Sequence, residues 1–166
     1  MDIGTLQPLC FLAALSPYFA QMDLAAAPLP LSFVHILNLH TVYGSDTHGP
    51  KIRFNIINES FLTDKNGIYL ITKGSKKAIV YCGTCSTRSF RNSLLFNNPK
   101  DLHFHNTDRV RSEVGRALQA SHIIEVHAQT EEQLRQQLIA LGASPADLGS
   151  LPAIKKVLTK LLGPEW

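Results

Sequence analysis

The chain has 166 residues, 45% of them hydrophobic and 17% charged, with a formal net charge of +3. A chain of this length and composition can bury a real core, and nothing in it demands disorder. Residues 1–50 contain no Lys or Arg, so the basic character belongs to the rest of the chain. The three cysteines, Cys10, Cys82 and Cys85, cannot form a framework of disulfides, and we therefore expect a reducing, cytoplasmic location.

The N-terminal residues 1–50 are predicted to form an apolar extension. Residues 6–20 fit neither a signal peptide nor a transmembrane helix, because no positive segment precedes them and prolines interrupt them. We expect a short helix from Thr5 to Leu15. A second apolar element is expected from Leu31 to Val42, where the periodicity does not decide between helix and strand. Turn-forming residues from Tyr43 to Pro50 predict the boundary of this extension, which would pack on the core or bind a partner or a membrane surface.

A β-hairpin is predicted at the centre of the chain. Residues Gly67–Thr72 and Ala78–Cys82 are rich in β-forming side chains. Gly74 between them can adopt the positive φ of a tight turn, and the lysines around it keep the turn in water. Antiparallel pairing of the two strands would bring Tyr69 and Tyr81 close together.

The hairpin is predicted to run into a basic helix, from Ser86 or Thr87 to Phe96, with Arg88 and Arg91 on one face. The other predicted elements are a strand over Ile52–Ile56, a helix from the cap Thr107 to Gln119 with Arg109, Arg111 and Arg116 exposed, a strand over His122–Ala128, a helix opened by Thr130 and ended near Gly142, and an amphipathic helix from Pro152 to Gly163-Pro164.

These elements predict an α+β fold with a small antiparallel three-stranded sheet flanked by helices. The expected organisation is an extension of residues 1–50, a module of residues 51–142, and a C-terminal amphipathic helix within residues 143–166. That last helix would pack either on the core or on a protein partner.

The hairpin carries a motif that resembles the GIY-YIG nuclease family. The matching residues are Gly67-Ile68-Tyr69 and Tyr81-Cys82-Gly83, with Cys82 where the family usually has Ile or Val. Arg91 falls at the position of the family's helix arginine. The resemblance implies that Tyr69 and Tyr81 position or deprotonate the attacking water, and that Arg91 holds the phosphate. It also implies one glutamate on a later helix that binds a single divalent ion, Mg²⁺ or Mn²⁺.

The position of that glutamate is occupied by Arg135, which cannot bind a cation. Glu131 and Glu132 lie one turn earlier and are the candidate metal ligands, since Mg²⁺ needs as few as one protein carboxylate. Their other interpretation is compensation of the helix dipole beside Thr130.

A surface for DNA is predicted within the most basic part of the chain, Lys65 to Arg116. The candidate contacts are Lys76, Lys77, Arg88 and Arg109, and the alternative is a face that only contacts solvent. A zinc or redox site at Cys82 and Cys85, with His103 and His105, is a rival use of these residues, although its spacing fits no known zinc finger.

Two functions follow from this interpretation. The first is a metal-dependent endonuclease that hydrolyses DNA phosphodiester bonds. The alternative is a catalytically lapsed module of the same fold that binds nucleic acid or a protein partner, with the N-terminal extension or the C-terminal helix as the surface for a protein.

Overall fold

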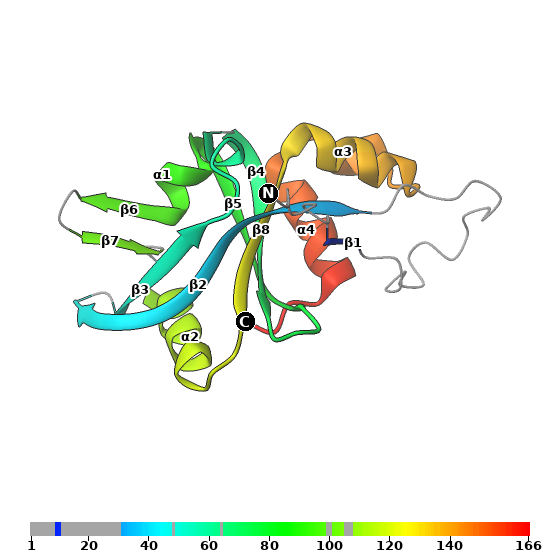
Figure 1. The fold of residues 1–166 in the computed structure, drawn as a ribbon. Helices are drawn as coiled ribbons and strands as arrows, with labels where there is room; N and C mark the ends of the chain where they lie inside the picture. Colours follow the sequence, from blue (N-terminus) through cyan, green and yellow to red (C-terminus); the bar gives the residue numbers. More distant parts are fainter. Residues whose placement is uncertain (1–8, 11–30, 48, 64, 99–100, 105–107) are drawn as a thin grey trace, which may run out of the picture.

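The protein has a mixed α+β architecture in a computed structural model (Figure 1). The structure describes residues 9–10, 31–47, 49–63, 65–98, 101–104 and 108–166. A six-stranded antiparallel sheet runs through the molecule, and helices pack on both of its faces. No helix of the described ranges is long and apolar enough to cross a membrane.

The main sheet has the strand order β1–β2–β8–β4–β5, and β3 also pairs with β2. The strands are β1 (Leu9–Cys10), β2 (Ser32–Asp46), β3 (Gly49–Ile56), β4 (Lys65–Lys73), β5 (Ala78–Ser89) and β8 (Ile124–Thr130). The predicted α+β class is therefore confirmed, but the sheet is larger than the three strands expected. The difference arises because the apolar run from Leu31 to Val42 contributes to a long strand, β2, that pairs with β8.

The predicted hairpin is present as β4 and β5, which pair antiparallel with Tyr69 opposite Gly83. Gly74 adopts a positive φ of 79° in the turn, as expected. Strand β4 also pairs with β8, so β4, which carries Tyr69, lies inside the sheet, and β5, which carries Tyr81, lies at its edge. Because side chains alternate along a strand, Tyr69 points to one face of the sheet and Ile68 and Leu70 point to the other.

Residues 43–47 and 49–50 belong to the tip of a hairpin of β2 and β3. The boundary expected at residue 50 therefore falls within a strand of the main sheet. Most of the helix expected from Thr5 to Leu15 lies outside the described residues. At Leu9 and Cys10 that prediction was wrong, because these residues pair with Phe33 and Ser32 as β1.

The first helix, α1 (Phe90–Leu94), is shorter than predicted. Strand β5 continues to Ser89, whose hydroxyl accepts a hydrogen bond from the backbone N–H of Asn92 and caps the helix. Arg88 consequently belongs to a strand and Arg91 to a helix. The prediction that these two arginines share one helical face was therefore wrong.

Three longer helices form close to the predicted positions. They are α2 (Asp108–Gln119), α3 (Glu131–Ala140) and α4 (Leu151–Leu162). Two short 3-10 turns lie at Phe61–Thr63 and Pro145–Leu148. A separate two-stranded sheet is formed by β6 (Leu95–Asn98) and β7 (Asp101–Phe104). Thr130 caps α3 by accepting from the N–H of Gln133, as predicted. Gly163 ends α4 in the left-handed conformation, with φ of 54°.

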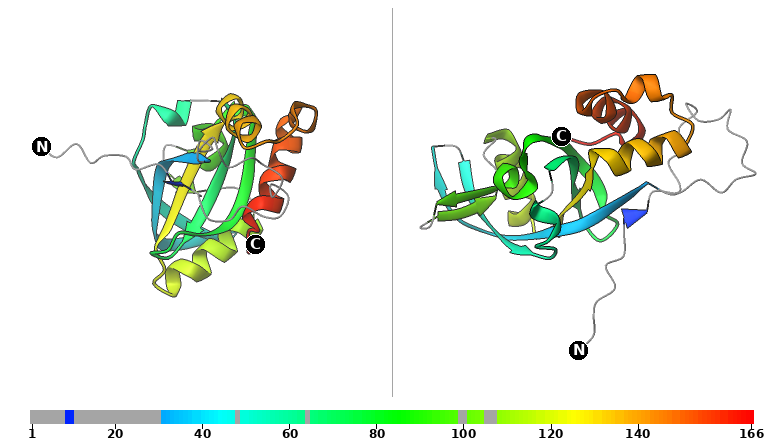
Figure 2. Two further views of the ribbon diagram at one scale, coloured as in Figure 1. Left: turned by 90° about the vertical axis from the view of Figure 1, so that its right-hand side faces the viewer. Right: turned by 90° about the horizontal axis from the view of Figure 1, so that it is seen from above.

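Each face of the sheet has its own hydrophobic core. The first face is the one covered by α1 and α2, and its core includes Tyr69, Ile71, Val126, Phe90, Leu94 and Val114. The second face is covered by α3 and α4, which lie side by side in Figures 1 and 2, and its core includes Ile68, Leu70, Leu134, Leu138, Ile154 and Leu158. The apolar side of α4 is thus used by the core of the chain itself.

Arg111 of α2 is buried, with 1% of its side chain exposed, although an exposed position was predicted. Its Nε donates to the carbonyl oxygen of Pro50 at 2.9 Å, and its Nη2 donates to that of Gly49. Both terminal nitrogens also contact the carboxylate of Asp46. The tip of the β2–β3 hairpin covers this side of α2, which the helical periodicity of the sequence does not indicate.

Candidate functional site

Tyr69 and Tyr81 lie side by side on the first face, as the hairpin predicts. Their ring centroids are 5.9 Å apart and the ring planes are inclined by 39°. Burial, followed by the neighbouring Tyr81, raises the pKa of Tyr69 well above its ordinary value. Its hydroxyl therefore stays protonated at neutral pH and is better suited to orienting a group by hydrogen bonding than to accepting a proton.

The two glycines that complete the motif have a packing role. A Cβ on Gly83 would lie 2.1 Å from Cζ of Tyr69, and a Cβ on Gly67 would lie 2.4 Å from Cζ of Phe90. No side chain can occupy either position without moving an aromatic ring. Both glycines are thus required by the fold, independently of any chemistry at the tyrosines.

Arg91 forms an ion pair with Glu59, which lies just before the 3-10 turn Phe61–Thr63. The side chains of Arg91 and Glu59 are 32% and 63% exposed, so water screens the pair. Exposed pairs of this kind contribute only about 0–1 kcal/mol to stability. The ion pair with Glu59 therefore holds the guanidinium of Arg91 only weakly.

Glu131 and Glu132 lie in the first turn of α3, which packs on the second face, whereas both tyrosines lie on the first face. The carboxylate of Glu131 accepts a hydrogen bond from Arg135 at 2.5 Å. Arg135 also donates through Nε to the carbonyl oxygen of Leu148. Glu132 is exposed. The role of these two acids as metal ligands stays a prediction.

Cys82 and Cys85 point to opposite faces of the sheet. Cys82 belongs to the core of the second face and Cys85 to that of the first, because residues three apart in a strand alternate. The rival idea that the two sulfurs share a zinc ion or act as a redox pair was therefore wrong. His105 and the side chain of His103 lie outside the described residues.

We expect both buried thiols to be almost unreactive in the folded protein. Burial raises the pKa of each to about 11. The opposing effects are smaller: the charge of Lys155 and a hydrogen bond with Thr159 for Cys82, and a hydrogen bond with Ser93 for Cys85. Only about one thiol in a thousand is then ionised at about pH 8. Reaction of the double variants Cys10→Ser/Cys82→Ser and Cys10→Ser/Cys85→Ser with a disulfide reagent, with and without urea, measures this for one thiol at a time. Rapid labelling of either thiol without urea would contradict the prediction.

The four residues predicted to bind DNA do not form one compact patch. Lys76 and Lys77 lie in the turn before β5, and Lys77 forms an ion pair of 3.0 Å with Glu125. Arg88 is exposed near the far end of the strand, roughly 33 Å from the turn by the rise per residue. Arg109 is exposed on α2, the helix that covers the first face of the sheet.

A basic groove lies between these ends of β5, where α4 packs against the strand. The groove has a volume of about 440 Å³ and is lined by Thr84, Pro152, Lys155, Lys156, Thr159 and Lys160. Lys155 is close enough to the thiol of Cys82 to favour its ionised form, which offsets part of the effect of burial on that pKa. Three lysines and two threonines therefore border one open depression.

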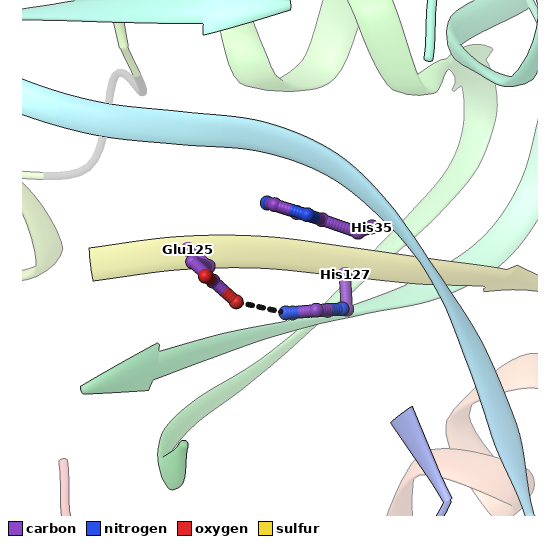
Figure 3. Close-up of side chains that lie close together, drawn as sticks. All are labelled: His35, Glu125 and His127. Carbon is purple, nitrogen blue, oxygen red and sulfur yellow. Dashed lines mark hydrogen bonds and ion pairs between the residues drawn. The ribbon is translucent and has the colours of Figure 1, made fainter. Parts of the chain in front are cut away.

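A second cluster lies where β2 meets β8. His35, Glu125 and His127 each place one ligand atom within 4.8 Å of the others, so the group could hold a metal ion (Figure 3). The Nε2 of His127 donates to Oε2 of Glu125 at 2.9 Å. The ring of His35 stacks on that of His127, with centroids 4.7 Å apart.

The electrostatics of this cluster follow from its burial. Burial lowers the pKa of His127 to about 4, although the hydrogen bond to Glu125 acts in the opposite direction. Burial alone would raise the pKa of Glu125, but hydrogen bonds from Lys77 and His127 outweigh it and lower that pKa. At neutral pH, His127 is therefore neutral and Glu125 is an anion.

Sequence reasoning missed the lysines of α4 and the whole cluster of His35, Glu125 and His127. The spacing of Lys156 and Lys160 on the polar side of an amphipathic helix was a readable signal. No local signal joins His35 to Glu125, because the pairing of distant strands brings them together.

No family model matches the chain, and neither a curated protein nor a solved structure matches it. The resemblance to GIY-YIG nucleases therefore rests on the hairpin motif and Arg91.

Proposed function

We propose that the protein binds nucleic acid along the edge of β5 and does not cleave it by the metal-dependent mechanism of GIY-YIG nucleases. The proposed surface, here called the basic track, consists of Lys76, Lys160, Lys156, Lys155 and Arg88. The observation that carries the proposal is the groove bordered by the three lysines of α4 and by Thr84. Lysine and threonine side chains are typical contacts to backbone phosphates.

The arrangement of the basic track fits an extended polyanion. The backbone N–H of Trp166 donates to the carbonyl oxygen of Val80, so the C-terminal end of α4 lies near the start of β5. Lys160 is thus nearest to the turn that carries Lys76, and Lys155 lies further along the strand, near Thr84. A phosphate backbone lying parallel to β5 would meet these ammonium groups in succession and release counterions.

Two features of α3 argue against the divalent ion of the family that the motif resembles. An arginine, Arg135, stands at the position of the acid, and its guanidinium binds the nearest carboxylate, that of Glu131. A cation placed there would have to displace a positive charge that already satisfies the carboxylate. The helix also packs on the face of the sheet opposite to Tyr69.

Binding and cleavage can be tested on the same preparation. We expect fluorescence anisotropy to report binding of labelled single- or double-stranded DNA that weakens steeply as salt rises. Supercoiled plasmid incubated with Mg²⁺ or Mn²⁺ should stay intact. Absence of DNA binding at low salt would refute the proposal.

The second candidate function is the metal-dependent endonuclease, favoured by the contact between Tyr69 and Tyr81 and by the exposed pair of Arg91. Plasmid nicking that requires Mg²⁺ or Mn²⁺, and that both Tyr69→Phe and Arg91→Ala abolish, would replace the proposed function with this one. Glu131 and Glu132 would then be tested as ligands by substitution with Gln.

A further inference from the structure

We propose that His35, Glu125 and His127 form a binding site for a first-row transition-metal ion such as Zn²⁺. Two imidazoles and one carboxylate supply two nitrogen donors and one oxygen donor, a set that suits Zn²⁺, Co²⁺ or Ni²⁺. Mg²⁺ is not expected here, because it prefers oxygen ligands and retains several waters. The site is separate from the basic track and does not depend on the proposed function.

The strand register places the three side chains next to one another on the same face of the sheet. Glu125 and His127 are two residues apart in β8, so they point to the same face of the sheet. The pairing of β2 with β8 places His35 opposite His127, and the register shifts between His35 and Leu37. Such a bulge redirects a side chain relative to a regular strand, and bulges are frequent beside functional sites.

The hydrogen bonds of His35 indicate which of its ring nitrogens carries the proton. Its Nε2 lies 3.2 Å from the carbonyl oxygen of Leu37 and 2.9 Å from Oδ1 of Asn38. A carbonyl oxygen can only accept, so Nε2 carries the proton and Nδ1 carries the lone pair. A histidine ligand whose second nitrogen donates to an oxygen is the usual arrangement around a bound metal.

His127 is the least satisfied member of the group. Its Nε2–H is donated to Glu125, yet its Nδ1 is buried with no hydrogen-bond partner. A buried acceptor without a partner costs about 1–3 kcal/mol. A metal ion at Nε2 would replace the proton that His127 shares with Glu125 and would leave the ring proton on Nδ1, which would then need a water or a shifted neighbouring oxygen as its acceptor.

Two features set the requirements for binding. Ligands about 2.0–2.1 Å from a tetrahedral Zn²⁺ are roughly 3.3 Å apart. The widest separation among the ligand atoms, which all lie within 4.8 Å of one another, must therefore shorten, and the stacked rings of His35 and His127 must turn so that a lone pair of each meets the ion. In addition, Nζ of Lys77 lies 3.0 Å from Oε2 of Glu125 and competes with a cation for that oxygen. Lys77 is 42% exposed and can turn into solvent. Three protein ligands leave a fourth position for water or another ligand.

The experiment is titration of the full chain, freed of metal by chelation, with Zn²⁺ in a calorimeter and with Co²⁺ in a visible spectrometer. We expect one equivalent of Zn²⁺ to bind and Co²⁺ to give ligand-field bands of a low-coordinate nitrogen and oxygen site. His35→Ala and Glu125→Gln should each weaken Zn²⁺ binding by at least about tenfold. Circular dichroism spectra of both variants show whether they fold.

Lys77→Met provides a test that does not remove a ligand. It deletes the competing charge, so Zn²⁺ affinity should rise several-fold. Lys76→Met removes the same charge from the adjacent, exposed position and should leave the affinity unchanged. The proposal is overturned if the wild type binds no stoichiometric Zn²⁺, or if binding is the same in His35→Ala and Glu125→Gln, because the ion would then lie elsewhere.

Discussion

Replacing Lys155, Lys156 and Lys160 together by Gln is expected to weaken DNA binding by roughly 10²-fold at about 0.1 M salt. Each lysine that contacts a phosphate contributes about 0.9 to the slope of log affinity against log salt. The slope should therefore fall by up to about 2.7 in the variant. Anisotropy titrations at several salt concentrations measure both quantities. Gln is a good helix former, so α4 should persist.

A second variant with the same loss of charge separates the groove from net charge. Arg53, Arg109 and Arg116 lie outside the groove, on β3 and α2, and their replacement by Gln also removes three positive charges. We expect this variant to bind DNA within about threefold of the wild type, since distant exposed charges are screened by salt. Equal losses in the two variants would show that only overall charge matters and would refute the basic track.

Replacing Arg111 by Met is expected to lower the free energy of unfolding by about 3 kcal/mol. Met keeps much of the apolar stem but removes every donor, so the carbonyl oxygens of Gly49 and Pro50 lose their partner. Asp46 loses a two-point ion pair, although its 28% exposure lets water replace part of it. Urea unfolding followed by circular dichroism measures the change.

The matched control is Arg109→Met, on the same helix and with the same loss of charge. Arg109 is exposed, so its replacement should change the free energy of unfolding by less than about 0.5 kcal/mol. Similar values for the two variants would mean that the buried contacts of Arg111 with the β2–β3 hairpin contribute nothing to stability.

Local patterns predicted the elements that depend on local chemistry. The β-forming runs around Gly74 predicted the hairpin, and Thr130 and Gly163 predicted helix ends that the structure confirms. Tyr69 and Tyr81 could be placed together because the turn between their strands is short. In each case the residues that carry the signal lie within a few positions of the turn or helix end that they predict.

The errors arose where distant segments decide the outcome. Arg111 sits on the polar side of α2 by sequence, but the hairpin of β2 and β3 covers it. The strand β5 extends past Thr87 because it pairs with β4 as far as Lys65 and Ser89, which overrides the helical pattern. His35 and Glu125 could not be joined from sequence for the same reason.

The pairing of β2 with β8 also has a consequence for folding. Val34 pairs with Ala128, so the chain between these two residues must close into one long loop before this part of the sheet can form. The β4–β5 hairpin needs only a short turn, and such local contacts form quickly. The interior strand β8 therefore depends on the slowest contacts of the fold, and His35 and His127 meet only when that long loop closes.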